Sequence, residues 1–123
     1  PKNSKVVILG LTFKENCPDT RNSKVDDIIK RLNEYGIEPA VVDSWASEKD
    51  AMHEYGVTLT KLEDVHDADC VIVAVAHDEF KAIKLDGMNR LFKQGAGTKV
   101  FIDVKGLYDI KKLNDSGFLW WRL

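Results

Sequence analysis

Continuous apolar segments alternate with helical segments along this chain, and that alternation constrains its fold more than any other feature. Most of the apolar segments are not interrupted by polar residues, which is typical of strands buried on both faces of a parallel sheet. The expected strands are 5–10, 39–44, 69–75, 99–105 and 118–123. Strands and helices in alternation, joined by right-handed crossovers, form a doubly wound sheet. We therefore expect an α/β, Rossmann-like fold in which a mainly parallel sheet of five to six strands forms a three-layer sandwich.

The helix expected over 24–35 has the clearest pattern. Its apolar residues recur at i, i+3, i+4 and i+7, namely Val25, Ile28, Ile29 and Leu32. Ser23 and Asp26 fit the S-x-x-D form of a capping box at its start, and Gly36 ends it. The remaining expected helices are 47–55, 62–67, 79–93 with a break near Gly87, and 109–115, and 57–60 is a candidate extra strand.

Composition indicates one domain and argues against several classes of protein. The 123 residues are 44% hydrophobic and 31% charged, with a formal net charge of -2, so no basic field is available to attract nucleic acid. The longest apolar run is too short to cross a membrane and no signal-peptide core is visible, so we expect a cytoplasmic protein. Neither Cys17 nor Cys70 belongs to a CxxC pair, so we expect reduced thiols and no metal site. Because the chain begins at Pro1, we expect a piece of a larger protein.

Doubly wound sheets bind ligands beyond the carboxyl ends of their strands, where the strand order reverses. The longest loop at that edge is 10–23, GLTFKENCPDTRNS. It is not a dinucleotide-binding loop, because Leu11, Thr12 and Phe13 follow Gly10 where a GxGxxG turn needs further glycines.

Asp43, at the end of the second expected strand, resembles the acid that binds ribose in dinucleotide-binding proteins. A role in a turn or a helix cap is favoured for it.

Charged residues give the first loop an anion-binding character. Lys14 is a compact charge suited to phosphate, and Arg21 offers a planar fork for phosphate or carboxylate. Lys105 leaves another strand at the same edge, so Lys14 and Lys105 are candidates to converge on one diphosphate. The alternative is that Lys14, Asp19 and Arg21 form solvated ion pairs of little energetic weight.

His77 suggests acid/base chemistry, but a structural role is favoured for it. Asp78 and Glu79 after it are typical of a helix start, and Phe80 is expected to pack under the sheet edge. Cys17 lies beside cations without a nearby histidine, so a structural role is favoured for it too.

Trp120 and Trp121 are expected to form an apolar strand face. The alternative is that one of them is exposed at an interface.

The first loop resembles the G-x-x-F-K…D-x-R-x-S signature in the UDP-binding, C-terminal domain of the UDP-glucose/GDP-mannose dehydrogenase family. The matching residues are Gly10, Phe13, Lys14, Asp19, Arg21 and Ser23. The segments AVAHDEF and FIDVKGLYD are similar to two further family segments in the same order. The resemblance covers essentially the whole chain, 1–123. The NSKV segment and the WWRL ending look most like the branch that acts on UDP-N-acetylhexosamines for capsule or O-antigen sugars.

The resemblance implies a fragment of an NAD-dependent enzyme that oxidises the C6 hydroxyl of a nucleotide sugar to a carboxylate for surface polysaccharide synthesis. The residues expected to line the UDP-sugar are Phe13, Lys14, Glu15, Asn16, Asp19 and Thr20. Arg21 is expected to contact NAD, which is held mainly by an N-terminal domain outside this chain. At Lys105 the family commonly has an arginine that approaches the substrate of a neighbouring subunit, so the resemblance implies that Lys105 also binds the substrate.

The expected partners are the UDP-sugar, the N-terminal and central domains of the same polypeptide, and further copies in a homodimer or larger assembly. No catalytic residue is expected in this fragment, so the isolated chain should be inactive. A non-catalytic α/β regulatory or protein-interaction module is the alternative function, and NAD binding by this domain itself, through Asp43, is a third.

Overall fold

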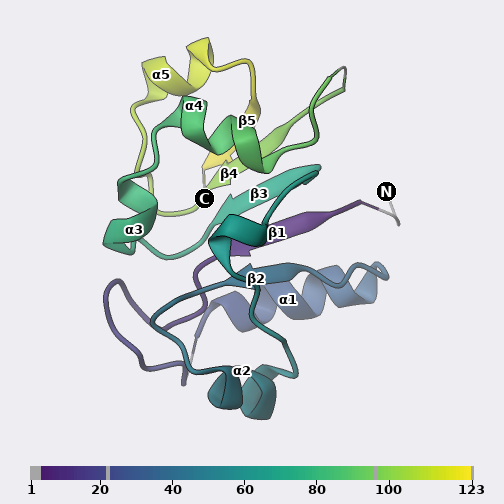
Figure 1. Ribbon diagram of the computed structural model, residues 1–123, viewed down its shortest axis with the longest axis vertical. Coiled ribbons are helices and arrows are strands. Elements are labelled where there is room, and N and C mark those ends of the chain that lie inside the picture. Colours follow the sequence, from purple (N-terminus) through teal and green to yellow (C-terminus); the bar gives the residue numbers. More distant parts are fainter. Residues whose placement is uncertain (1–3, 22, 96, 123) are drawn as a thin grey trace.

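Five strands form one parallel sheet in the order β2-β1-β3-β4-β5 (Figure 1). The computed structural model describes residues 4–21, 23–95 and 97–122. The strands are β1 (Val6–Leu9), β2 (Ala40–Val42), β3 (Cys70–Val73), β4 (Val100–Asp103) and β5 (Leu119–Arg122). The expected doubly wound α/β fold with a parallel sheet is confirmed. Pro1 and two residues of the quoted segments, Asn22 and Leu123, lie outside the described residues.

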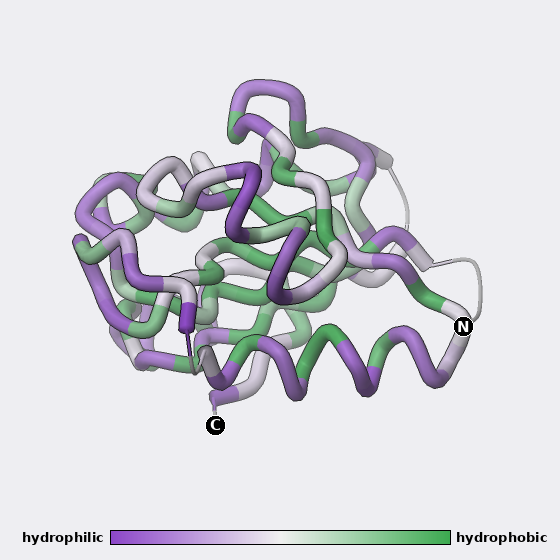
Figure 2. Tube along the Cα trace, turned by 90° about the horizontal axis from the view of Figure 1, so that it is seen from below, coloured by the Kyte–Doolittle hydropathy of each residue, from purple (hydrophilic) through white to green (hydrophobic). Residues whose placement is uncertain are grey.

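Helices pack on both faces of the sheet. The helices are α1 (Val25–Glu34), α2 (Glu48–Tyr55), α3 (Asp78–Lys81), α4 (Leu85–Met88) and α5 (Ile110–Asp115), with 3-10 turns η1 (Leu62–Asp64) and η2 (Asn89–Leu91). Figure 1 shows α1 and α2 beside β2, and α4 and α5 beside β4 and β5. Figure 2 shows the hydrophobic segments gathered in the interior and the hydrophilic ones on the outside.

Successive side chains of each strand pack into different cores, because strand side chains alternate between the two faces. Val7 of β1 joins the core formed with α3, α4 and α5, which also contains Phe80 and Phe101. Ile8 joins the other core, where Ile29 is one of the residues contributed by α1. All four residues of β1 are buried, which explains the continuous apolar run in the sequence.

Two expected helices are shorter than the sequence indicated. The expected helix 62–67 is only the turn η1, because Val65 returns to an extended conformation and is buried. The expected helix 79–93 is divided between α3 and α4, and its break lies before Lys84, while Gly87 lies within α4. The hydroxyl of Tyr108 donates to the carbonyl oxygen of Ile83 at 2.6 Å, which occupies an acceptor that a continuous helix would use.

The expected capping box at Ser23 does not form, because the amide of Ser23 donates to the hydroxyl of Tyr55 and not to the side chain of Asp26; α1 begins at Val25. The hydroxyl of Ser23 accepts from the amide of Val25 at 3.2 Å, and Asp26 pairs with Lys30 at 2.9 Å instead of capping. Segment 57–60 contributes a single isolated bridge, between Leu59 and Val41, rather than a strand.

The order of the strands locates the ligand-binding edge. From β1 the chain moves outward to β2 and then crosses back to β3 on the other side of β1. The strand order therefore reverses between β1 and β3, and ligands of such sheets bind outside the carboxyl ends at this switch point. The loop 10–23 follows β1, and residues 74–77 follow β3.

Gly10 lets these two strand ends approach closely, which gives a test of the fold. It has a φ of +108°, and a Cβ atom there would lie 2.5 Å from the Cβ of Val75 and 2.9 Å from its backbone nitrogen. We expect Gly10→Ala to lower the free energy of unfolding by about 2–4 kcal/mol, from backbone strain and overpacking together. Gly56→Ala is the control, since Gly56 has a φ of +67° with nothing within 4 Å. Urea unfolding of both variants measures the difference, and equal losses would contradict the role of close approach.

Candidate functional site

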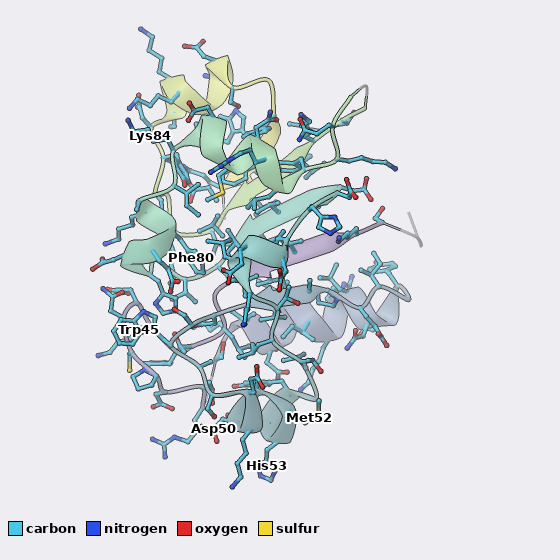
Figure 3. The ribbon with its side chains drawn as sticks, in the orientation of Figure 1. Trp45, Asp50, Met52, His53, Phe80 and Lys84 are labelled. Carbon is cyan, nitrogen blue, oxygen red and sulfur yellow. The ribbon has the colours of Figure 1, made fainter. Side chains whose placement is uncertain are left out.

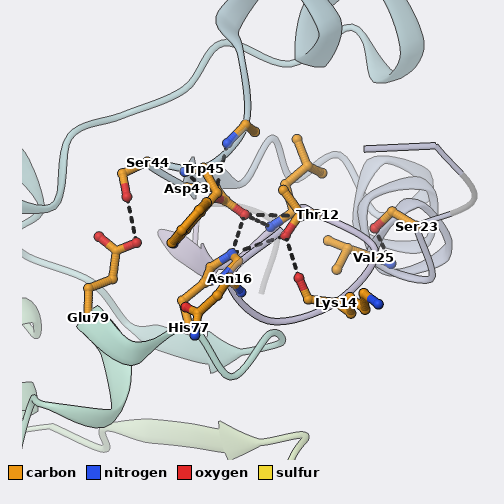
Figure 4. A network of polar contacts seen from close by, with 12 residues as sticks. Thr12, Lys14, Asn16, Ser23, Val25, Asp43, Ser44, Trp45, His77 and Glu79 are labelled. Atoms are coloured by element: carbon orange, nitrogen blue, oxygen red, sulfur yellow. Dashed lines mark hydrogen bonds and ion pairs between the residues drawn. The ribbon is translucent and has the colours of Figure 1, made fainter. Parts of the chain in front are cut away.

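The carboxylate of Asp43, just after β2, organises the loops that follow β1 and β2 (Figure 4). Asp43 is 3% exposed. Its Oδ2 accepts hydrogen bonds from the amides of Leu11 at 2.7 Å and Thr12 at 3.0 Å, at the start of the first loop. Its Oδ1 accepts from the amides of Trp45 at 2.8 Å and Ala46 at 3.2 Å. Asp43 therefore stabilises a turn, as the sequence favoured, and also the loop after β1.

The imidazole of His77 joins the loop after β3 to the same carboxylate. His77 is fully buried, and its Nδ1 accepts from the amide of Asn16 at 2.8 Å. An acceptor nitrogen carries no proton, so the hydrogen lies on Nε2, which donates to Oδ2 of Asp43 at 2.9 Å. The hydroxyl of Thr12 lies 3.1 Å from the same Nε2. Both ring nitrogens are thus engaged within the protein, which supports the structural role favoured for His77.

These contacts determine the ionisation of Asp43. Burial alone would raise its pKa, but hydrogen bonds from His77, Leu11 and Thr12 outweigh burial and hold the pKa below its ordinary value. Asp43 is therefore ionised at neutral pH. Its charge is stabilised by hydrogen-bond donors from three loops, which makes it a cross-link between them.

The middle of the first loop is held by Asn16. This residue has a φ of +52°, a conformation that asparagine tolerates better than most residues. Its side-chain oxygen accepts from the amide of Asp78 at 3.0 Å, at the start of α3. Across the loop, the amide of Phe13 donates to the carbonyl oxygen of Asp19 at 2.7 Å, which closes the segment 13–19 into a compact turn.

The end of the loop is held by Tyr55 of α2. Its hydroxyl donates to the carbonyl oxygen of Thr20 and accepts from the amide of Ser23 at 3.2 Å. Thr20 is buried, so its side chain faces the protein. The loop is therefore fixed at its start, middle and end by contacts to three other elements.

Between these contacts the loop exposes Phe13, Lys14 and Glu15. Asp19 and Arg21 form a solvent-exposed ion pair, with Nε 3.1 Å from Oδ1. Hydrogen bonds from Arg21 lower the pKa of Asp19. This pair has the geometry of the solvated alternative, which contributes little to stability. Lys14 takes no part in an ion pair within the described residues, so its charge is available at the surface.

Lys105 is exposed in the turn after β4, at the same edge of the sheet. β3 lies between β4 and β1, so the strands that precede Lys105 and Lys14 are about 10 Å apart. The turn that carries Lys105 is organised by the buried Asp103, whose carboxylate accepts from the amides of Leu107 at 2.9 Å and Tyr108 at 3.0 Å. The structure thus places both lysines at the expected edge without bringing them into contact.

Sequence reasoning missed two features of this edge. Asp103 has a role parallel to that of Asp43, and an aspartate at the carboxyl end of an apolar strand segment was the signal for both. Trp45, 42% exposed, stacks on the ring of His77 with the ring centres 6.1 Å apart and stands at the outer side of the loops (Figure 3).

Two expected absences concern the described residues alone. Within them there is no group of three or more His, Cys, Asp or Glu residues arranged to hold a metal ion. None of their helices has the length and apolar character to cross a membrane.

Comparison with known proteins gives a consistent result. The model of the UDP-glucose/GDP-mannose dehydrogenase family, UDP binding domain, matches residues 7–110. UDP-N-acetyl-D-glucosamine 6-dehydrogenase of Pseudomonas aeruginosa is 47% identical over 109 residues, which cover 89% of this chain and 25% of that enzyme. Protein CapL of Staphylococcus aureus is 38% identical, over 97% of this chain and 27% of that protein.

A solved structure shows the same fold. The NDP-N-acetyl-D-galactosaminuronic acid dehydrogenase from Methanosarcina mazei Go1 aligns with a TM-score of 0.81 at 20% identity, over 98% of this chain and 25% of that one. The chain therefore spans about a quarter of the length of the relatives that it matches.

Removing the charge of Asp43 tests its organising role. We expect Asp43→Asn to lower the free energy of unfolding at pH 7 by about 2–4 kcal/mol, because buried amide donors lose a charged acceptor. The folded-state pKa lies below the unfolded one, so the contribution of the carboxylate is present above pH ~3.9 and is lost as the pH falls through the folded value. Denaturant unfolding across pH 7 to 2.5 should show the deficit shrinking below pH ~3.9. A deficit independent of pH would contradict the role of the charge.

Proposed function

The chain belongs to the UDP-glucose/GDP-mannose dehydrogenase family, by its UDP-binding domain, and we propose that it binds the nucleotide sugar for an NAD-dependent UDP-sugar 6-dehydrogenase. The full-length enzyme oxidises the C6 hydroxyl of the sugar to a carboxylate for surface polysaccharide synthesis. The observation that carries the proposal is the loop 10–21, which is fixed at three points and exposes Lys14, unpaired among the described residues, at the switch point of the sheet. Relatives named as UDP-N-acetylhexosamine dehydrogenases support this branch of the family.

Individual residues of the loop have different proposed roles. Lys14 contacts the phosphates or the sugar, because its ammonium is exposed and unpaired within the described residues. Phe13 and Glu15, also exposed, border the nucleotide. Asn16 and Thr20 already use polar groups to fix the loop, so they contribute to the substrate site through the shape that they give the loop backbone.

Two charged residues near the end of the loop, Asp19 and Arg21, have separate proposed partners. Asp19 belongs to the substrate side, and it holds the guanidinium of Arg21 in a defined direction. Arg21 then contacts NAD bound by a domain outside this chain. Lys105 contributes to the substrate site from the turn after β4. NAD, when bound, accepts the hydride that leaves the sugar carbon. The exposed guanidinium suits the anionic diphosphate of such a cofactor.

Binding of NAD by this chain alone is disfavoured by Asp43. An acid that binds ribose must present a free carboxylate, but both oxygens of Asp43 accept hydrogen bonds inside the protein. The proposed enzyme therefore needs further domains, and it acts as a homodimer or larger assembly. The isolated chain binds UDP weakly and is inactive.

Titration of the isotope-labelled chain with UDP tests the proposed site. We expect amide shifts in residues 12–21 and near Lys105, because the ligand lies against the first loop and the turn after β4. Amides of α5, away from that loop, serve as the internal control. No shifts at millimolar UDP would overturn the proposal.

Lys14→Ala in the full-length enzyme separates this proposal from a non-catalytic interaction module. We expect a rise in KM for the nucleotide sugar, or a fall in turnover, of about tenfold or more, because a charge on the substrate loses its partner; tenfold equals roughly 1.4 kcal/mol. Lys111→Ala is the matched control, since Lys111 is an exposed lysine on α5. Steady-state kinetics measure both variants, and unchanged constants for Lys14→Ala would favour the interaction module.

A further inference from the structure

The face of the sheet that carries α1 and α2 is only partly covered by the described residues. Val6 and Ile8 of β1, which lie under these helices, are buried. On the same face of β5, Leu119 is 48% exposed and Trp121 is 51% exposed. Coverage therefore decreases from the middle of the sheet toward β5, although the side chains remain apolar.

Strand register identifies the side chains of this uncovered region. Val100 pairs with Leu119 and Ile102 pairs with Trp121, so these four share one face. We call the region the open face, and its residues are Cys70, Val100, Ile102, Val104, Leu119 and Trp121. Trp120 points to the opposite face, where it packs against the core and donates to Asn114 at 3.1 Å. Of the two adjacent tryptophans, only Trp121 has no place in the described core.

A groove extends the open face at the amino ends of the strands. Its volume is about 550 Å³, and the residues that line it are Ser4, Val6, Ile37, Asp69, Cys70, Thr98 and Val100. Cys70 and Val100 belong to both surfaces, so the groove and the open face form one continuous apolar surface beside α1. Burial raises the pKa of the Cys70 thiol to about 11, so this thiol is uncharged at neutral pH.

The dimensions of the open face fit a single helix. Parallel sheets are normally covered by helices on both faces. Two strands span about 10 Å, close to the diameter of a helix with its side chains. A second copy of the chain offering its own sheet would meet α1, which projects from the same face and prevents a flat approach.

We propose that the open face is the docking site for an apolar helix from the part of the full-length polypeptide that lies outside this chain. The relatives supply the length for such a segment, since this chain spans 25% of the Pseudomonas aeruginosa enzyme and 27% of Protein CapL. The docked helix completes the helical layer beside α1 and covers Leu119 and Trp121. The proposal concerns the attachment of the domain and does not depend on which ligand the first loop binds.

Hydroxyl-radical footprinting of the full-length protein tests the docking. In this chain Trp121 and Tyr35 have comparable exposure, at 51% and 61%. After correction for intrinsic reactivity, we expect Trp121 to be oxidised at least fivefold more slowly than Tyr35. Oxidation of Trp121 at the same rate as Tyr35 would overturn the proposal.

A double variant distinguishes the helix from a second copy. Leu119→Glu with Trp121→Glu places two charges in the open face, and Met52→Glu is the control, because Met52 is exposed on the outer side of α2 (Figure 3). If a helix of the same polypeptide docks there, calorimetry of the double variant shows this domain melting separately, with the oligomeric state unchanged. Dissociation of the assembly with a single melting transition would show that a second copy occupies the face, and the proposal would be wrong.

Discussion

The structure depends on one buried negative charge. Parallel strands that end at a common edge leave amide groups that no strand satisfies. At this switch point the carboxylate of Asp43 accepts hydrogen bonds from four such amides and from the ring of His77. Buried charges are costly unless they are paired and hydrogen-bonded, and here the same donors that stabilise the charge define the paths of three loops. The shape of the candidate site is therefore a consequence of how this charge is satisfied.

A loop fixed in this way has an advantage for binding. Ordering a flexible segment upon ligand binding costs conformational entropy, and a loop already held at Leu11, Asn16 and Thr20 avoids most of that cost. The exposed side chains of Phe13 and Lys14 are then presented from a defined backbone while they keep their own freedom. This division between fixed backbone and free side chains suits a domain that contributes one wall of a larger site.

The sequence was sufficient for the fold class, the five strands and the edge at which the candidate site lies, because these follow from local patterns. It was insufficient where contacts between distant residues decide the outcome. The break before Lys84 depends on Tyr108, and the path of the first loop depends on Asp43 and His77. At Ser23 a local pattern was present, but the capping box did not form, because Asp26 pairs with Lys30 and the amide of Ser23 donates to Tyr55.

Asn16 has a consequence for motion. Its amide is held by the ring of His77 and its side-chain oxygen by the amide of Asp78, so the first loop and the first turn of α3 are joined by two hydrogen bonds. A displacement of either segment would strain these two hydrogen bonds. They connect the first loop to α3, which packs on the opposite face of the sheet from α1 and α2.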